Sequence, residues 1–179
     1  MSVNDRDSSR QITEHLIKVH GHARVAHLSG PRAISIGKKR FEGYKDALQA
    51  HHLPVEEKWI IECGFREEAG YKGMNKLLSL PKNEHPTAIV AVNDPVAFGA
   101  IKAIEEAGYS IPDDFAIAGF TDDIRAPLLK VPLTTVHQFT YDVGKRAAKK
   151  LLQVINDSSE ATENIEVLTE LKIRNLCGC

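Results

Sequence analysis

Short apolar runs alternate along this chain with longer segments of helical periodicity. The apolar runs are rich in β-branched residues and have the length of strands buried on both faces. They are residues 24–29, 58–62, 87–92 and 115–120. Between them, apolar residues recur three or four positions apart, which predicts amphipathic helices over 34–50, 67–80 and 95–107. Strands alternating with helices predict an α/β fold: a doubly wound parallel sheet with helices on both faces.

The two ends of the chain have weaker patterns. Asp5, Asp7, Ser8 and Ser9 are turn and N-cap residues, and a helical stripe then continues to Gly21. Later segments are expected as follows: a short extended piece at 133–136, a helix at 141–155, a polar and mobile segment at 156–164 and a last strand at 165–173.

The segment around Asp94 is the most informative of these units. The buried strand 87–92 is broken by Asn93 and Asp94, and Pro95 opens the next helix. Asp94 is expected at the N-cap, with Pro95 at the first helical position. Open α/β sheets hold ligands beyond the carboxyl ends of their strands. Asp94 is therefore expected to cap its helix, to contact a ligand, or to do both.

Composition narrows the class of protein. The 179 residues are enough for one domain with a substantial core, and a formal net charge of −1 provides no general attraction to nucleic acid. We see no secretory signal and no run long enough to cross a membrane. Three cysteines, two of them at positions 177 and 179, do not form a disulfide framework. These features predict a cytoplasmic chain without membrane contact.

No motif for catalysis or cofactor binding is present. The sequence lacks a Gly-x-Gly-x-x-Gly fingerprint, a phosphate-binding Gly-Lys-Ser/Thr loop and a Gly-x-Ser-x-Gly elbow. Cys63 has no activating neighbour, and the histidine pairs at 20/22 and 51/52 have no third ligand at useful spacing. Cys177-x-Cys179 could ligate a soft metal, although a frayed tail is the preferred interpretation. We therefore expect neither an enzyme nor a cofactor nor a metal site.

Side chains suited to a small molecule follow the predicted strands. Arg40 carries a planar donor fork that can hold two oxygens of one ligand, and Phe65 offers an apolar face to a sugar or a planar ring. Asp94 and Asp122 come directly after the third and fourth strands. Each has a structural alternative, but together they predict a ligand cleft at the carboxyl edge of the sheet.

Several short motifs occur in one order along the chain. They are residues 25–31 (Val-Ala-His-Leu-Ser-Gly-Pro), 40–44 (Arg-Phe-Glu-Gly-Tyr), 93–94 (Asn-Asp), 111–114 (Ile-Pro-Asp-Asp), 119–120 (Gly-Phe) and 132–136 (Pro-Leu-Thr-Thr-Val). With these motifs the chain resembles the LacI/GalR family of bacterial transcriptional regulators. The match runs from about Asp5 to about Arg174. The resemblance implies the effector-binding region, whose fold has two α/β lobes joined by three crossover strands with the ligand between them.

The same resemblance assigns roles to individual residues. Arg40 matches the family's ligand-gripping arginine, Asp94 its ligand-binding aspartate and Phe65 the stacking aromatic. Gln138 matches a polar residue on the third crossover, and Asp122 and Asp5 lie near the cleft. Ile34 and Ile36 stand where some members place polar ligand contacts, which counts against a purine-like effector without excluding it. The resemblance implies a small-molecule effector, a sugar or related metabolite.

The resemblance also implies domain organisation and partners. Residues 1–137 and 158–179 would form the C-terminal lobe, and 138–157 a crossover and helix belonging to a missing N-terminal lobe. The helices 67–80 and 95–107 would contribute to a homodimer, and DNA would be bound only through a missing N-terminal domain. The orphaned helix 141–155 would fold back, swap onto another chain or drive association. The alternative is a lobe of a periplasmic sugar-binding transport protein.

Overall fold

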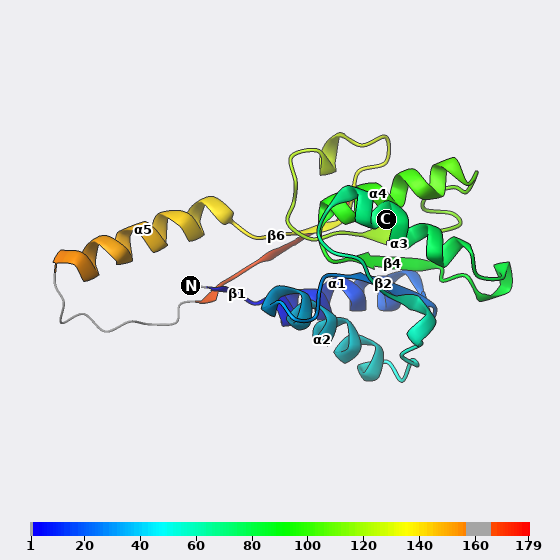
Figure 1. Ribbon diagram of the computed structural model, residues 1–179, viewed down its shortest axis with the longest axis horizontal. Coiled ribbons are helices and arrows are strands. Elements are labelled where there is room, and N and C mark those ends of the chain that lie inside the picture. The colour runs from blue at the N-terminus through cyan, green and yellow to red at the C-terminus, as the bar shows by residue number, and fades with distance from the viewer. Residues whose placement is uncertain (1, 157–165) are drawn as a thin grey trace.

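A four-stranded parallel sheet forms the centre of the molecule (Figure 1). The structure, a computed structural model, describes residues 2–156 and 166–179. The strands are β2 (Val25–Ser29), β3 (Ile60–Glu62), β4 (Ala88–Ala91) and β5 (Ala116–Ala118), in the spatial order β3-β2-β4-β5. All three neighbouring pairs are parallel, which confirms the predicted fold class.

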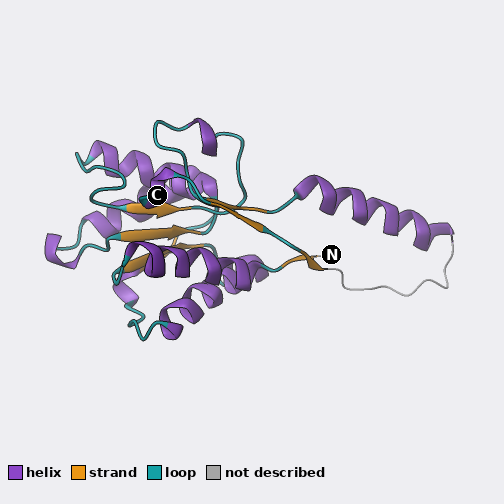
Figure 2. Cartoon of the chain, turned by 180° about the vertical axis from the view of Figure 1, so that it is seen from behind, coloured by secondary structure: helices purple, strands orange, loops and turns teal. Residues whose placement is uncertain are grey.

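Helices cover both faces of this sheet (Figures 1 and 2). Helices α1 (Asp5–His20) and α2 (Ser35–Ala50) pack on one face, and α3 (Glu67–Leu78) and α4 (Asp94–Glu106) on the other. The side chains of β4 alternate accordingly: Ile89 packs toward α3 and α4, whereas Val90 packs toward α1 and α2. Burial on both faces explains why the strands are apolar throughout.

Two glycines allow α3 and α4 to pack closely. A Cβ at Gly99 would overlap the Glu67 carbonyl oxygen, and one at Gly70 would overlap the Val96 carbonyl oxygen. The backbones of the two helices therefore meet directly, without side chains between them.

Short strands connect this layer to the remaining elements. Strand β1 (Ser2–Val3) pairs with β7 (Glu166–Val167), and β6 (Thr135–His137) pairs with β8 (Glu170–Lys172). Beyond them α5 (Thr140–Asn156) extends away from the sheet and buries none of its residues (Figures 1 and 2). The helix does not fold back on this lobe. Among the described residues, no helix has both the length and the hydropathy required to cross a bilayer.

Helix α1 begins earlier than the sequence pattern predicts. Asp5, Asp7, Ser8 and Ser9 are helical rather than turn residues, and Asn4 is the N-cap, accepting a hydrogen bond from the Asp7 amide (3.1 Å). Serine disfavours helix interiors because its hydroxyl competes for backbone groups. Here the Ser8 hydroxyl donates to the Asn4 carbonyl and the Ser9 hydroxyl to the Arg40 carbonyl, both at 2.7 Å.

Two further boundaries differ from the prediction. The N-cap of α4 is Asn93, which accepts a hydrogen bond from the Val96 amide (3.0 Å), and Asp94 is already helical. Either Asx residue could cap the helix, so the pattern alone did not distinguish them. The single strand predicted at 165–173 is two strands, β7 and β8. Most of the segment predicted to be mobile, from residue 157 to 164, lies outside the described residues.

Candidate ligand-binding site

The carboxyl ends of the parallel strands meet at one edge of the sheet. Arg40, Phe65 and Asp94 all lie around Val92, just after β4. Arg40 Nη1 donates to the Val92 carbonyl at 2.5 Å. Phe65 and Val92 both lie next to Gly30, since a Cβ atom added to this glycine would be 2.7 Å from the Phe65 ring and 3.2 Å from the Val92 side chain. Three residues that are far apart in sequence are thus brought together, as the cleft hypothesis requires.

Arg40 is held rigidly by its neighbours. Its Nε and Nη2 donate to Oδ1 of Asp5 at 2.9 and 2.7 Å, and the guanidinium lies 3.6 Å from the centroid of the Phe120 ring. Burial lowers the pKa of Arg40, and the carboxylate of Asp5 opposes that shift. Within the described part of the chain, these bonds use three of the five guanidinium donors. One N–H on each Nη has no hydrogen-bond partner among the described residues.

Asp94 has a structural role, because its carboxylate joins separate segments of the chain by hydrogen bonds. Its side chain is fully buried, and it accepts hydrogen bonds from the Thr135 hydroxyl (2.6 Å) and the Asp123 amide (2.7 Å). Burial raises the pKa of Asp94, and these hydrogen bonds oppose the shift. A Cβ at Gly119 would overlap the carboxylate, so glycine is needed there. Asp94 thereby ties the turn after β4 to the turn after β5.

Asp122 connects β6 to the residues just after β8. Its two oxygens face His137 Nδ1 (2.9 Å) and Arg174 Nη2 (2.7 Å). Arg174 also donates to the Leu133 carbonyl (2.8 Å), so it links β8 to the segment before β6. The backbone of Asp122 has a φ of 55°, in the left-handed region that aspartate tolerates better than most residues.

Phe65 is partly exposed at the same edge. The ideal Cβ position of Gly30 lies 2.7 Å from the Phe65 ring, so only glycine at position 30 leaves room for it. The Asn93 side chain donates to the Phe65 carbonyl (2.9 Å) and fixes the turn that carries the ring. This turn follows β3 and is therefore at the carboxyl edge.

A cavity of about 370 Å³ opens between α2, the start of α1 and the segment that leads from β6 into α5. Two predicted site residues, Asp5 and Gln138, line it, and Arg40 lies directly behind Asp5. Ile36 contributes an apolar wall. Val3, Ser35, Lys39, Thr140 and Val143 also line it and were not predicted. The volume suits a small metabolite.

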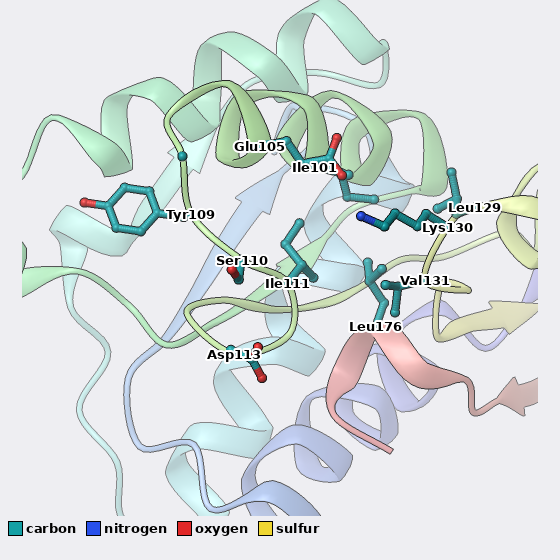
Figure 3. Close-up of a pocket in the computed structure, with 11 residues that line it drawn as sticks. Ile101, Glu105, Tyr109, Ser110, Ile111, Asp113, Leu129, Lys130, Val131 and Leu176 are labelled. Atoms are coloured by element: carbon teal, nitrogen blue, oxygen red, sulfur yellow. The ribbon is translucent and has the colours of Figure 1, made fainter.

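A larger hollow of about 730 Å³ lies elsewhere, between the end of α4, the turn after it and residues 129–131 (Figure 3). None of the six predicted site residues lines it. The smaller cavity is favoured as the ligand site because Asp5 and Gln138 line it, whereas the other four predicted residues, Arg40, Phe65, Asp94 and Asp122, line neither cavity.

Cys63 follows β3 near this edge, and its thiol is expected to be unreactive. Burial raises the pKa of its thiol to about 11, so the reactive thiolate is scarce at neutral pH. This agrees with the absence of an activating neighbour in the sequence, and the side chain is partly buried.

Comparison with known proteins identifies the family. Residues 13–175 match the model of the periplasmic binding protein-like domain. The HTH-type transcriptional repressor PurR of Mannheimia succiniciproducens is 37% identical over 161 residues, covering 90% of this chain and 47% of that protein. The chain thus spans about half the length of the curated relatives it matches.

Solved structures agree in fold. A LacI-family regulatory protein from Chloroflexus aggregans superposes with a TM-score of 0.89 at 32% identity, covering 96% of this chain and 61% of that one. A LacI-family regulator from Enterococcus faecium with bound ribose gives 0.87 at 28%, covering 96% and 62%. These relatives are regulators and not enzymes, in agreement with the prediction of a non-catalytic chain. The chain belongs to the periplasmic binding protein-like family, and it corresponds to the effector-binding domain of LacI-family regulators.

Proposed function

We propose that this chain forms one wall of the effector cleft of a LacI-type transcriptional regulator and recognises a sugar or related metabolite. The observation that carries the proposal is the cavity at the carboxyl edge, where Asp5 and Gln138 face one space with Arg40 immediately behind. Since the curated relatives are repressors, a regulator is favoured over a transport protein, and the cytoplasm is its proposed location.

Each side chain has a proposed role at the cleft. Gln138 would exchange hydrogen bonds with a hydroxyl of the ligand. Arg40 and Phe65 do not line the cavity, so their contacts need a ligand that extends past Asp5 along the edge of the sheet. Arg40 would then bind ligand oxygens with its two remaining N–H groups, in a position fixed by Asp5, and Phe65 would stack on a sugar ring. Asp94 and Asp122 would act by positioning the turns after β4 and β5, since their carboxylates already hold neighbouring groups.

The polar part of the lining suits a ligand with hydroxyl groups. Hydroxyl, amide, ammonium and carboxylate groups of Ser35, Gln138, Lys39 and Asp5 lie at the cavity, and the apolar side chains of Val3, Ile36 and Val143 form the larger part of its wall. Such a mixture of donors and acceptors matches the hydroxyl groups of a sugar. The Enterococcus faecium relative was solved with ribose, which makes ribose a suitable first probe.

Residues 138–157 are proposed to belong with a second lobe. Helix α5 buries no residue and exposes Leu151, Leu152 and Ile155, each by more than half of its surface. Such an apolar face needs a partner. In a complete regulator, closure of two lobes around the effector would favour one of two states and so change how DNA-binding segments are spaced.

A homodimer through α3, α4 and the loop that contains residues 124–128, after β5, completes the proposal. Ile124 and Leu128 are 83% and 77% exposed on that loop. Arg125 anchors the loop by contacts with Glu67 of α3 (3.2 Å) and the Phe98 ring of α4 (4.3 Å). Replacing both apolar residues by aspartate should abolish dimers of the complete regulator in light scattering; persistence of the dimer would refute this surface.

The cleft can be tested on this chain by two-dimensional NMR during a ribose titration. With one wall present, we expect weak, millimolar binding, with shifts confined to amides of Ser35, Lys39, Gln138 and Thr140. Gln138→Ala should weaken the response, whereas Gln49→Ala, on the far end of α2, should not. Shifts centred on Tyr109 and Ile111, or none with any sugar tested, would refute the site.

A further inference from the structure

Four side chains with metal-binding atoms meet at the end of α1, away from the proposed cleft. They are His15, His20, Cys177 and Cys179, and their ligand atoms all lie within 4.8 Å of one another. His15 and Cys177 are separated by 162 positions in sequence. His15 lies ten residues beyond Asp5 along α1, a rise of about 15 Å, so this cluster is distinct from the cleft.

The distances within the cluster already approach those of a tetrahedral metal site. His15 Nε2 lies 3.4 Å from Cys177 Sγ and 3.5 Å from Cys179 Sγ, and His20 Nε2 lies 3.2 Å from Cys179 Sγ. With Zn–S bonds of about 2.3 Å and Zn–N bonds of about 2.0 Å, tetrahedral ligand atoms are separated by roughly 3.3–3.8 Å. The ligand atoms that are farthest apart, within 4.8 Å of each other, would need to move about 1 Å closer together to reach these tetrahedral separations.

The C-terminal segment is anchored, contrary to the preferred interpretation of a frayed tail. Leu176 is buried in the core beside α4, and its amide donates to the Pro132 carbonyl (2.9 Å). Gly178 has a φ of 100°, which side-chain-bearing residues rarely adopt, and it passes close to the His20 ring. This turn directs both cysteines toward α1.

Cys177 has a hydroxyl donor beside its sulfur. The Thr134 hydroxyl lies 3.0 Å from Cys177 Sγ and can donate to it, as groups around metal-bound thiolates do. Without metal, this hydroxyl also faces the Arg174 carbonyl (2.8 Å), to which the Cys177 thiol donates (3.1 Å), and metal binding would replace the thiol bond. Cys177 and His15 are buried, whereas Cys179 is exposed and His20 is partly exposed. The cluster thus has a closed inner side and an open side through which an ion can enter.

We propose that His15, His20, Cys177 and Cys179 bind one Zn²⁺ and thereby fasten the C-terminal segment to the end of α1. Two thiolates and two imidazoles form a common zinc ligand set. Four protein ligands leave no open coordination position, so the ion would be structural rather than catalytic. The sequence showed no third ligand near His20 because the fold supplies it from the other end of the chain.

Cobalt provides a direct test with the reduced, metal-free chain. One equivalent of Co²⁺ should bind and give the intense visible bands of tetrahedral cobalt together with a thiolate charge-transfer band, and Zn²⁺ should displace it. His20→Ala and Cys179→Ser should each weaken binding by about 100-fold or more, beyond the effect of a residue outside the ligand set. Both sites are at least partly exposed, so the variants should fold, which circular dichroism checks.

Matched controls make the test specific. Cys63→Ser removes the third thiol and His52→Asn removes an exposed histidine elsewhere; both variants should bind cobalt like the parent chain. Zn²⁺ should raise the unfolding temperature of the parent and of Cys63→Ser but not of His20→Ala. If oxidation to a Cys177–Cys179 disulfide abolishes binding and reduction restores it, the cysteines are confirmed as ligands.

Other outcomes would overturn the proposal. A weak, octahedral cobalt spectrum would exclude coordination by thiolates. Equal affinity of His20→Ala, Cys179→Ser and the parent would place the ion elsewhere. Absence of binding by the fully reduced chain would show that the four side chains are a packing arrangement only.

Discussion

Arg40 and Asp5 form a buried ion pair that joins two helices at the edge of the sheet. The guanidinium donates twice to one carboxylate oxygen, at 2.9 and 2.7 Å, across 35 positions of sequence. The two side chains are only 4% and 6% exposed. The pair fixes the start of α1 against α2 and sets the position of the guanidinium beside the proposed cleft.

Arg40→Ala should destabilise the chain strongly. Removal of one partner leaves the other charge buried and unpaired, which costs about 3–5 kcal/mol in comparable pairs. Urea denaturation measures the loss. Arg32→Ala is the matched control, because its pair with Glu62 (3.1 Å) is about half exposed and contributes about 0–1 kcal/mol. Equal losses of unfolding free energy in the two variants would show that the buried Arg40–Asp5 pair contributes no more to stability than the exposed Arg32–Glu62 pair.

His27 should make stability depend on pH. It is fully buried in β2, stacks on Tyr44 and faces the Val90 carbonyl (2.9 Å), and burial lowers its pKa to about 4. The unfolded chain takes up this proton near pH 6.5, the folded chain only near pH 4. Stability due to neutral His27 is therefore complete above pH 6.5 and lost as pH falls toward 4, by at most about 3 kcal/mol.

The variant His27→Phe isolates this effect. Phenylalanine keeps the ring against Tyr44 but binds no proton, so its unfolding free energy should vary less between pH 4 and 6.5 than that of the parent. His52→Asn, at an exposed position, should retain the parental slope. Parallel pH profiles for all three proteins would exclude His27 as the source.

The fold was predictable because its signals are local. Helix α2 was expected at 34–50 and spans Ser35–Ala50, and the apolar run at 87–92 contains β4. Periodicity within a dozen residues determines which face of each element is buried. Errors occurred where a distant contact decides: Ser9 reads as a turn residue until its hydroxyl meets the Arg40 carbonyl.

The candidate site was only partly predictable for the same reason. The order of strands and turns placed Arg40, Phe65 and Asp94 at one edge, and the structure brings them together. No pattern indicated that Asp94 would be fully buried under Thr135 and the Asp123 amide, or that Lys39 would line the cavity. Such outcomes depend on packing between elements that sequence spacing does not encode.

Gly99→Ala should destabilise the α3–α4 interface. The added Cβ would overlap the Glu67 carbonyl, a backbone atom that cannot rotate away, and overpacking of this kind costs about 1–3 kcal/mol or more. Gly144→Ala in α5 is the control, since nothing lies within 4 Å of its Cβ position. Urea denaturation should show a loss for the first variant alone; an unchanged midpoint for Gly99→Ala would mean that the helices can separate freely.

The uncovered face of α5 should make the isolated chain associate. Leu151 and Leu152 are 61% and 59% exposed on a helix with no buried residue, and apolar surface of this kind is covered by another molecule at sufficient concentration. Light scattering over a concentration series should therefore show growth in mass. Leu151→Asn/Leu152→Asn should reduce that growth, with the unfolding free energy of the sheet unchanged within about 0.5 kcal/mol.

The matched control is Lys145→Asn/Lys149→Asn, which introduces two asparagines into the same helix without removing apolar surface. This variant should associate as the parent does. A parent chain that stays monomeric throughout the series would show that α5 needs no partner, and the assignment of residues 138–157 to a second lobe would lose its physical basis.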